Sequence, residues 1–373
     1  MTEHEHSDTG ASAALPAEAL GAAPGPKSVL MKVLSAGLSG ALLVLLFLVI
    51  IPALGDLEEV WEAITSMSPT TVVLLIIAAL AIRALLAAAY PPLIPGLSFV
   101  RSVIARESSS AVSNVIPGPS GTAAQYVVLR SWGVSTERFA GATVGVSVIT
   151  YAIVFAAPGL LLILWVLLGQ PAKAGSHQVW LIGVITLVIT AITVTVVTAV
   201  TRSERLAAML GRVGQACVNP LRRLARKDPI TTWPESARST RSDTLELVRG
   251  NASVLAATIG GGYVLNGLLL VWCLWACGID EAVMPMSLGL FIYAVARALT
   301  VVPITPGGIG VVELVYTAAY VAVLGDESQD AVLAGVLVYR ALTYALPLLT
   351  GAVSYLAWRI MRRREIHHAA AST

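Results

Sequence analysis

The sequence predicts an all-α, polytopic membrane protein, and three observations support that fold class. Hydrophobic residues make up 56% of the 373 residues and charged residues only 12%, whereas an average soluble domain has roughly 25% charged residues. Several apolar runs reach the roughly 20 residues that a helix needs to cross a bilayer. Basic residues gather in some of the intervening segments and are absent from others, as in chains that cross a membrane repeatedly.

Six apolar runs are predicted to be full membrane spans. They cover residues 30–51, 70–90, 139–168, 179–201, 253–277 and 331–358. The first run is too long for the core of a signal peptide and follows a long acidic tail, so we expect it to be retained as a span. The third run contains Pro158-Gly159, and we expect it to be kinked or tilted.

The remainder of the chain divides around these spans. Residues 1–27 are rich in Ala, Gly, Pro and Glu without periodicity, which is typical of a disordered tail. We expect residues 28–365 to form a single transmembrane domain and residues 366–373 to be a short tail.

The positions of the charged residues orient the spans. The loop at 202–249 is rich in arginine, and the segment "RIMRRRE" follows the last span, whereas the connections at 278–283 and 325–330 contain acidic residues and no basic ones. Basic segments stay on the cytoplasmic side. Both termini are therefore predicted to be cytoplasmic, as six crossings require.

Two further segments contain helix breakers and are predicted to be re-entrant hairpins. Residues 107–129 lie between Arg106 and Arg130 and contain "NVIPGPSGTAAQ"; about ten residues on each side of this break are too few to cross about 30 Å. Residues 284–324 contain "VVPITPGGIGVVEL" and would enter from the opposite face. Their first limb is long enough to cross, so two full spans, giving eight in all, are the alternative.

The two halves of the chain are predicted to form an inverted repeat. The halves, about 28–170 and 177–361, each contain three crossings and one broken segment, and the breaks "VIPGPSG" and "PITPGGIG" occupy matching positions. An odd number of crossings inverts the second half relative to the first. Inverted repeats with broken helices are typical of transporters, whose substrate site lies near the bilayer midplane.

The two breaks supply candidate substrate-binding residues. Irregular backbone at membrane depth is buried in protein or lines a polar cavity, and a half-helix that begins there exposes N–H groups suited to a phosphate or carboxylate. Thr305 before Pro306 fits an N-cap, and Ser120 would cap the other tip. The candidates are Pro117, Gly118, Ser120, Gly121, Thr305, Gly307, Gly308 and Gly310. Turns that only let the hairpins pack are the alternative, for Gly118 and Gly121 especially.

Ionisable residues inside the apolar runs complete the candidate site. They are Arg83, Arg297, Glu313 and Arg340, and each costs roughly 2.5–3.5 kcal/mol at the bilayer centre unless it faces a partner or a cavity. Three arginines against one glutamate leave an excess of positive charge, which an anionic head group would balance. The alternatives are a structural pair of Glu313 with Arg340 or Arg297, and an Arg83 that snorkels inward. Weaker candidates are Asn114, Gln125, Tyr293, Tyr339 and Tyr344.

Two stretches resemble a known family. "PITPGGIGVVELVYTAAYVAVLG" and "AVLAGVLVYRALTYALPLLTG" are similar to the membrane region of the lysylphosphatidylglycerol synthase family, a flippase-type domain. The resemblance covers roughly residues 30–360 and implies that Glu313 and Arg340 are the family's charged positions and Arg83 its second-helix arginine. Pro119 and Thr122 stand where one common form of the family has charged residues, so head-group recognition is expected to differ there. No soluble transferase domain follows the last span before Thr373, which resembles the lipid-moving part alone.

These observations predict a lipid flippase or transporter of the cytoplasmic membrane rather than an enzyme. Its cargo would be a lipid or lipid-linked substrate with an anionic or zwitterionic head group, such as an aminoacylated phospholipid, a glycolipid or a polyprenyl phosphate. The three cysteines form no ligand pattern, so neither a metal nor a cofactor is expected. The expected partners are membrane lipids and not nucleic acid, with a homo-oligomer or a partner enzyme binding through loop 202–249. A non-transporting scaffold is the main alternative. An intramembrane lipid-linked transferase is less favoured, since the apolar runs offer no acidic pair.

Overall fold

The structure is a computed structural model that describes residues 57–116, 119–167, 177–203, 250–301 and 305–371, with a few isolated positions between 204 and 249. The predicted tail at 1–27, the predicted first span at 30–51, most of loop 202–249, and Pro117 and Gly118 lie outside the described residues. Every regular element within the described ranges is helical. This confirms the predicted all-α class for that part of the chain.

The helices follow one another with short connections. Their order is α3 (Leu57–Thr65), α4 (Pro69–Ala87), α5 (Phe99–Val115), α6 (Ser120–Ser131), α7 (Thr136–Leu167), α8 (His177–Arg202), α11 (Ala252–Leu255), the π-helical turn η3 (Ala256–Gly260), α12 (Gly261–Ala276), α13 (Met286–Leu299), the 3₁₀ turn η4 (Pro306–Gly308), α14 (Val311–Leu324), the 3₁₀ turn η5 (Asp326–Ser328), α15 (Gln329–Arg340), the π-helical turn η6 (Ala341–Ala345) and α16 (Leu346–Ala371).

Four helical stretches in the described part are long and apolar enough to cross a membrane. They are Pro69–Ala87, Thr136–Trp165, Ala252–Ala276 and Asp326–Glu365, and they correspond to four of the predicted spans. Shorter apolar stretches are Gly183–Val196 in α8, Met286–Leu299 and Val311–Leu324. Large apolar side chains are exposed along α8, such as Val184, Val188 and Ile192. Lipid rather than water is the medium that suits such a surface.

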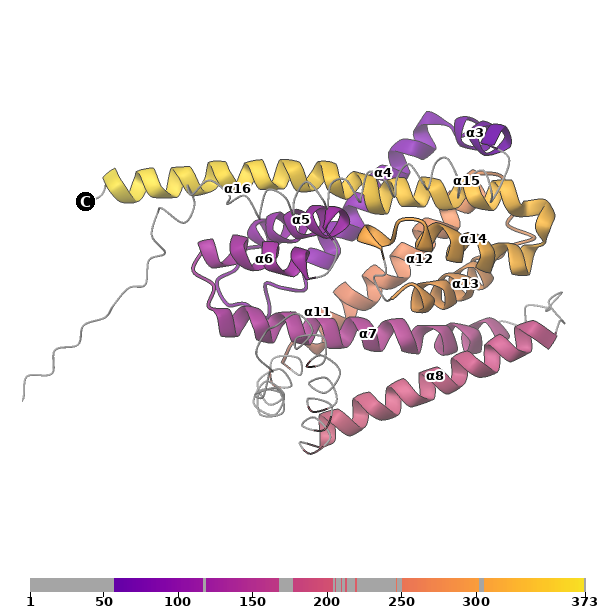
Figure 1. The fold of residues 1–373 in the computed structure, drawn as a ribbon, viewed down its shortest axis with the longest axis horizontal. Coiled ribbons are helices and arrows are strands. Elements are labelled where there is room, and N and C mark those ends of the chain that lie inside the picture. The colour runs from indigo at the N-terminus through magenta and orange to yellow at the C-terminus, as the bar shows by residue number, and fades with distance from the viewer. Residues whose placement is uncertain are drawn as a thin grey trace, which may run out of the picture.

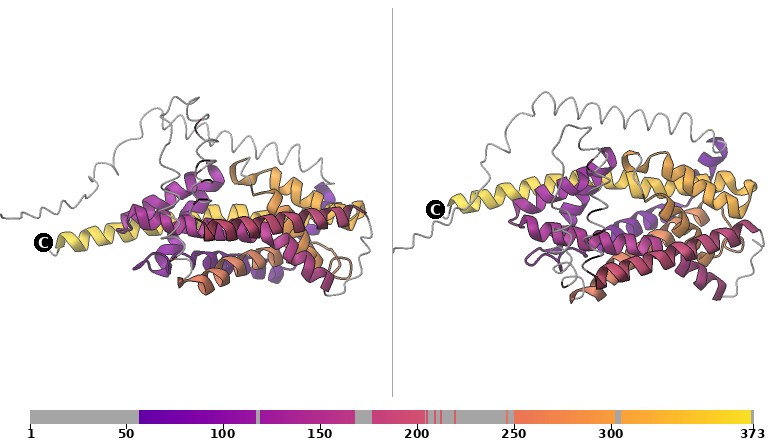
Figure 2. Two further views of the ribbon diagram at one scale, coloured as in Figure 1. Left: turned by 90° about the horizontal axis from the view of Figure 1, so that it is seen from below. Right: turned by 60° about the horizontal axis from the view of Figure 1, so that its bottom comes forward.

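Long helices enclose the shorter ones. Helices α15 and α16 continue through η6 as one rod along the longest axis of the molecule, and α7 runs along the opposite side with α8 packed outside it (Figure 1). The two further views show that α16 and α7 stay aligned with that axis (Figure 2). Helices α12, α13 and α14 lie between the rods, and α5 packs along α16.

Helix α7 runs through the predicted kink at Pro158-Gly159 as one helix. Proline lacks an N–H and clashes with the preceding turn, which frees backbone polar groups inside the membrane. The Thr190 hydroxyl of α8 satisfies them: it accepts from Gly159 N–H at 3.2 Å and lies 3.3 Å from the carbonyl oxygens of Phe155 and Ala156. A neighbouring threonine is a common way to tolerate proline in a transmembrane helix.

The first predicted hairpin is formed by α5 and α6, which pack against each other. The Ser98 side chain accepts from Arg101 N–H and begins α5, and Ile116 ends it in an extended conformation. Gly121 lets α6 approach α5 closely, because a Cβ there would lie 2.7 Å from the carbonyl oxygen of Ser109. The alternative that Gly121 serves hairpin packing is therefore confirmed.

The second broken segment is formed by α13, η4 and α14. Gly307, Gly308 and Gly310 have φ values of +58°, +74° and +80°, a left-handed conformation in which a side chain is strained. This run of glycines lets the chain leave η4 and enter α14 within a few residues. Helices α13 and α14 each have 14 residues and are about 21 Å long.

Candidate functional site

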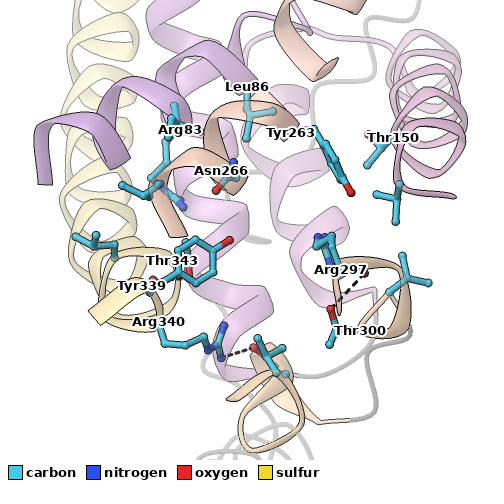
Figure 3. A pocket seen from close by; sticks show the side chains of 18 of the residues that line it. Arg83, Leu86, Thr150, Tyr263, Asn266, Arg297, Thr300, Tyr339, Arg340 and Thr343 are labelled. Carbon is cyan, nitrogen blue, oxygen red and sulfur yellow. Dashed lines mark hydrogen bonds between the residues drawn. The ribbon is translucent and has the colours of Figure 1, made fainter. Parts of the chain in front are cut away.

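A cavity of about 560 Å³ lies where the two broken segments approach each other. Its walls come from α4, α5, α7, α12, α13, η4, α14, α15 and η6, so both halves of the chain contribute. Four of the lining side chains are arginines: Arg83, Arg106, Arg297 and Arg340. Figure 3 shows three of them, Arg83, Arg297 and Arg340, on different walls of the cavity.

The tips of the two broken segments meet at this cavity. At the end of α5, Asn114 Nδ2 donates to the carbonyl oxygen of Tyr344 at 2.9 Å, and the Tyr344 hydroxyl donates to the Asn114 carbonyl at 3.2 Å. Gly307 of η4 fits against the same pair, because a Cβ there would lie 2.3 Å from the Tyr344 ring and 3.3 Å from Asn114 Cα. The first tip, the second tip and the π-helical turn η6 are thus joined.

Arg340 holds the second broken segment to α15. Its Nε donates to Glu313 Oε1 at 2.7 Å and its Nη2 donates to the Gly307 carbonyl at 2.9 Å. The guanidinium also lies over the Tyr344 ring, 5.1 Å from its centroid. Glu313 is only 2% exposed. The alternative of a structural Glu313–Arg340 pair is therefore confirmed, and Arg340 still lines the cavity.

The N-terminus of α14 already has its anion. Glu313 Oε2 accepts from Gly310 N–H at 2.8 Å, so the protein's own carboxylate satisfies the end of the helix where a substrate anion was expected. Thr305 does not cap this helix, which begins at Val311; its hydroxyl donates to the Ile309 carbonyl at 2.9 Å. The expected Thr305 cap was wrong because a 3₁₀ turn and two left-handed residues separate it from α14.

Arg83 has a carboxylate partner that sequence reasoning missed. Its Nε and Nη2 donate to Glu107 Oε2 at 2.9 and 2.7 Å, and the Thr350 hydroxyl hydrogen-bonds the same oxygen. Glu107 is 5% exposed, and these contacts join α4, α5 and α16. Arg83 therefore does not snorkel. Glu107 was overlooked because it adjoins Arg106 at the start of the first hairpin, although an arginine inside an apolar helix signals a partner elsewhere.

Arg106 and Arg297 line the cavity without a carboxylate partner in the described part of the chain. Arg297 interacts electrostatically with four tyrosines of the surrounding helices, Tyr263, Tyr293, Tyr316 and Tyr339. These rings follow one another at centroid distances of 5.4, 6.0 and 6.1 Å. We call them the tyrosine row.

The cavity therefore carries an excess of positive charge. Of its four guanidinium groups, two are balanced by Glu107 and Glu313, which leaves a net charge of +2 (4 − 2) among these six residues. Neither carboxylate is among the cavity-lining residues. The sequence predicted an excess of the same size from three arginines and one glutamate, and the structure adds Arg106 and Glu107 to the set.

The other predicted site residues divide between cavity and scaffold. Thr305, Gly307 and Gly308 line the cavity with Arg83, Arg297 and Arg340. Gly310 and Glu313 lie behind the lining as the N-terminal cap of α14. Ser120 and Gly121 are not among the lining residues. Ser120 is the first residue of α6 rather than its cap, and its hydroxyl donates to the Ile116 carbonyl. Pro117 and Gly118 lie outside the described residues.

Of the weaker candidates, Asn114, Tyr293 and Tyr339 line the cavity, whereas Gln125 is buried in α6 away from it. Sequence reasoning did not single out Tyr263, Asn266, Tyr316 or Thr343, which also line it. Tyr263 and Asn266 are three residues apart and so share one face of the apolar helix α12, a signal that was available. Within the described ranges, no group of three or more His, Cys, Asp or Glu side chains is placed to hold a metal ion.

Comparison with known proteins places the chain in a family. No curated protein matches the sequence. The family described as "Lysylphosphatidylglycerol synthase TM region" matches residues 20–351, a range that contains all four cavity arginines and both of their carboxylate partners. This is most of the chain. The protein is therefore a member of the lysylphosphatidylglycerol synthase transmembrane-region family, a membrane domain related to lipid flippases.

Proposed function

We propose that the protein is a multi-pass protein of the cytoplasmic membrane that moves a lipid or lipid-linked substrate, with an anionic or zwitterionic head group, between leaflets. The observation that carries this proposal is a cavity lined by four arginines at the meeting point of two broken helical segments. Arginine binds phosphate through paired, charge-assisted hydrogen bonds. A polar cavity enclosed by apolar helices suits a head group whose acyl chains remain in the bilayer.

The proposed topology has both termini in the cytoplasm, with α5–α6 and α13–α14 as hairpins that enter from opposite faces. Helices α13 and α14 are 14 residues each, about 21 Å long, which is shorter than a hydrocarbon core of about 30 Å. Two full spans therefore fit this segment less well than a re-entrant hairpin. The basic connections supply the orientation.

In the proposed mechanism the two tips form the barrier between the leaflets. The head group would bind in the cavity, and separation of the Asn114–Tyr344 contact would open it toward one face. The ion pairs Arg340–Glu313 and Arg83–Glu107 keep each broken segment attached to the long helices during that movement. Glu313 thus acts as a counter-charge inside the protein. We propose that the substrate crosses chemically unchanged.

The first experiment is mass spectrometry of the lipids retained by the purified full-length protein. Wild type is compared with Arg340→Gln, and with Arg359→Gln, which removes the same charge from an exposed position on α16. Enrichment of one lipid class in wild type and Arg359→Gln, with its loss in Arg340→Gln, supports the proposal. A retained-lipid profile equal to that of the bulk membrane in all three proteins contradicts it and favours a non-transporting scaffold.

A further inference from the structure

The two arginines without a carboxylate partner in the described residues differ in their surroundings. Arg106 lies on α5 with Arg83 and Glu107 beside it, so the nearest acid is already bonded to Arg83. Arg297 lies on α13, where its neighbours are the tyrosine row. Arg297 is therefore the cavity guanidinium with the largest unmet demand for an anion.

Tyr263 offers a second unmet group at the same place. It is 8% exposed and lines the cavity, yet its buried hydroxyl has no hydrogen-bond partner among the described residues. Figure 3 shows this hydroxyl directed toward the side of the cavity where Arg297 lies. A buried hydroxyl without a partner is destabilising. A phenol donor and a guanidinium that face one space together make a site for a phosphate oxygen.

The same lining is unsuited to an ammonium group. No carboxylate is among the described residues that line the cavity, and four guanidiniums would repel a second cation. Tyrosine faces can bind a cation, but Arg297 already lies among the rings of the tyrosine row. A lysyl ester of phosphatidylglycerol has one phosphate charge and two ammonium groups, so its net charge has the same sign as the cavity's.

We infer that the cargo is a lipid whose head group is a phosphate anion without an ammonium group, and that Arg297 and Tyr263 bind this phosphate, with Arg106 as the second positive charge. This inference rests on the proposed function and narrows it, because it excludes cationic aminoacylated lipids and zwitterionic lipids as the preferred cargo. Arg297 anchors the phosphate with two N–H donors, and the Tyr263 hydroxyl donates to a third oxygen.

The lipid class is tested by binding to the full-length protein in detergent, measured by native mass spectrometry. The probes are phosphatidic acid, phosphatidylglycerol, lysylphosphatidylglycerol and phosphatidylcholine with identical acyl chains. The two anionic lipids are expected to bind about tenfold more tightly than the other two, because one charge-assisted contact to phosphate accounts for about that factor. Movement of the same lipids, carrying a fluorescent acyl chain, is then followed in proteoliposomes.

The site is tested by Tyr263→Phe and Arg297→Gln. Loss of an unpartnered hydroxyl is expected to leave the melting temperature unchanged or higher while phosphatidic acid binds several-fold more weakly. Tyr320→Phe is the matched control, because the Tyr320 hydroxyl donates to the Gly289 carbonyl at 2.7 Å away from the cavity lining. That variant is expected to melt at a lower temperature and to bind lipid as wild type does. Arg297→Gln is expected to lose about tenfold in binding.

Each outcome separates the inference from the function on which it rests. Equal or tighter binding and movement of lysylphosphatidylglycerol or phosphatidylcholine overturns the inference and leaves the transport proposal standing. Unchanged phosphatidic acid binding in Tyr263→Phe and Arg297→Gln overturns the site assignment. Failure of wild type to bind or move any of the four lipids contradicts the proposed function itself, and with it the inference.

Discussion

Asn114 and Tyr344 hold each other through two hydrogen bonds although 230 residues separate them in the chain. Each residue donates from its side chain to the main-chain carbonyl of the other. The bonds join the end of α5 to the π-helical turn η6, and they flank Gly307. A π-helical turn is often found at functional sites, and here it turns the Tyr344 carbonyl toward the first broken segment.

Removal of either half of this contact should loosen the junction of the two tips. We expect Asn114→Ala and Tyr344→Phe each to lower the free energy of unfolding by about 1 kcal/mol. The double variant should lose less than the sum, because the two bonds share one geometry. Unfolding in mixed detergent micelles measures these values. Tyr355→Phe on the outer part of α16, where the ring is exposed, is the control, and strictly additive losses would show that the contacts are independent.

The Glu313–Arg340 pair should be much more sensitive than an exposed ion pair. Glu313→Gln leaves the Arg340 charge without its partner at a buried site, and we expect a loss of roughly 3–5 kcal/mol. Glu365→Gln breaks half-exposed contacts with Arg101 and Arg362 and should change stability by less than about 1 kcal/mol. Combining Glu313→Gln with Arg340→Gln should cost less than the two single losses added together. Equal losses in Glu313→Gln and Glu365→Gln would contradict the buried role of the pair.

Glu107→Gln should separate stability from anion binding. The change leaves Arg83 without a counter-charge, and Thr350 keeps an oxygen to bond, so we expect a loss of several kcal/mol, up to about 5 kcal/mol. All four cavity arginines remain, so phosphatidic acid should bind at least as tightly as it does to wild type. Glu137→Gln at the exposed start of α7 is the control. Weaker phosphatidic acid binding in a folded Glu107→Gln protein would show that Glu107 orders the site itself.

Gly307→Ala tests the close approach at the tips against simple backbone strain. Both Gly307 and Gly133 have positive φ, +58° and +85°, but a Cβ has open space only at Gly133. Gly133→Ala should therefore cost only the left-handed conformation, roughly 1–2 kcal/mol. Gly307→Ala should cost more and slow lipid movement, because the new Cβ displaces Tyr344. Similar melting temperatures and transport rates for the two variants would argue against a tight junction.

The fold class and the apolar helices were readable from the sequence, because both depend on local composition. Runs such as 70–90 and 253–277 are apolar over the length of a span, and the structure has long apolar helices there. The breaks at "PGPSG" and "ITPGGIG" were readable for the same reason, since proline and glycine interrupt helices wherever they occur. The motif that contains Glu313 and the Tyr339-Arg340 pair also identified the family correctly.

The sequence by itself thus determined that this is an all-helical membrane protein with two interrupted segments and unbalanced arginines. Only the tertiary structure decided which charges are balanced: Glu107 pairs with Arg83 across 24 residues and Glu313 with Arg340 across 27. It also decided that Glu313, rather than Thr305, caps α14, and that Tyr263 reaches the cavity. These relationships depend on how helices from both halves pack, and local sequence patterns carry no information about contacts between distant segments.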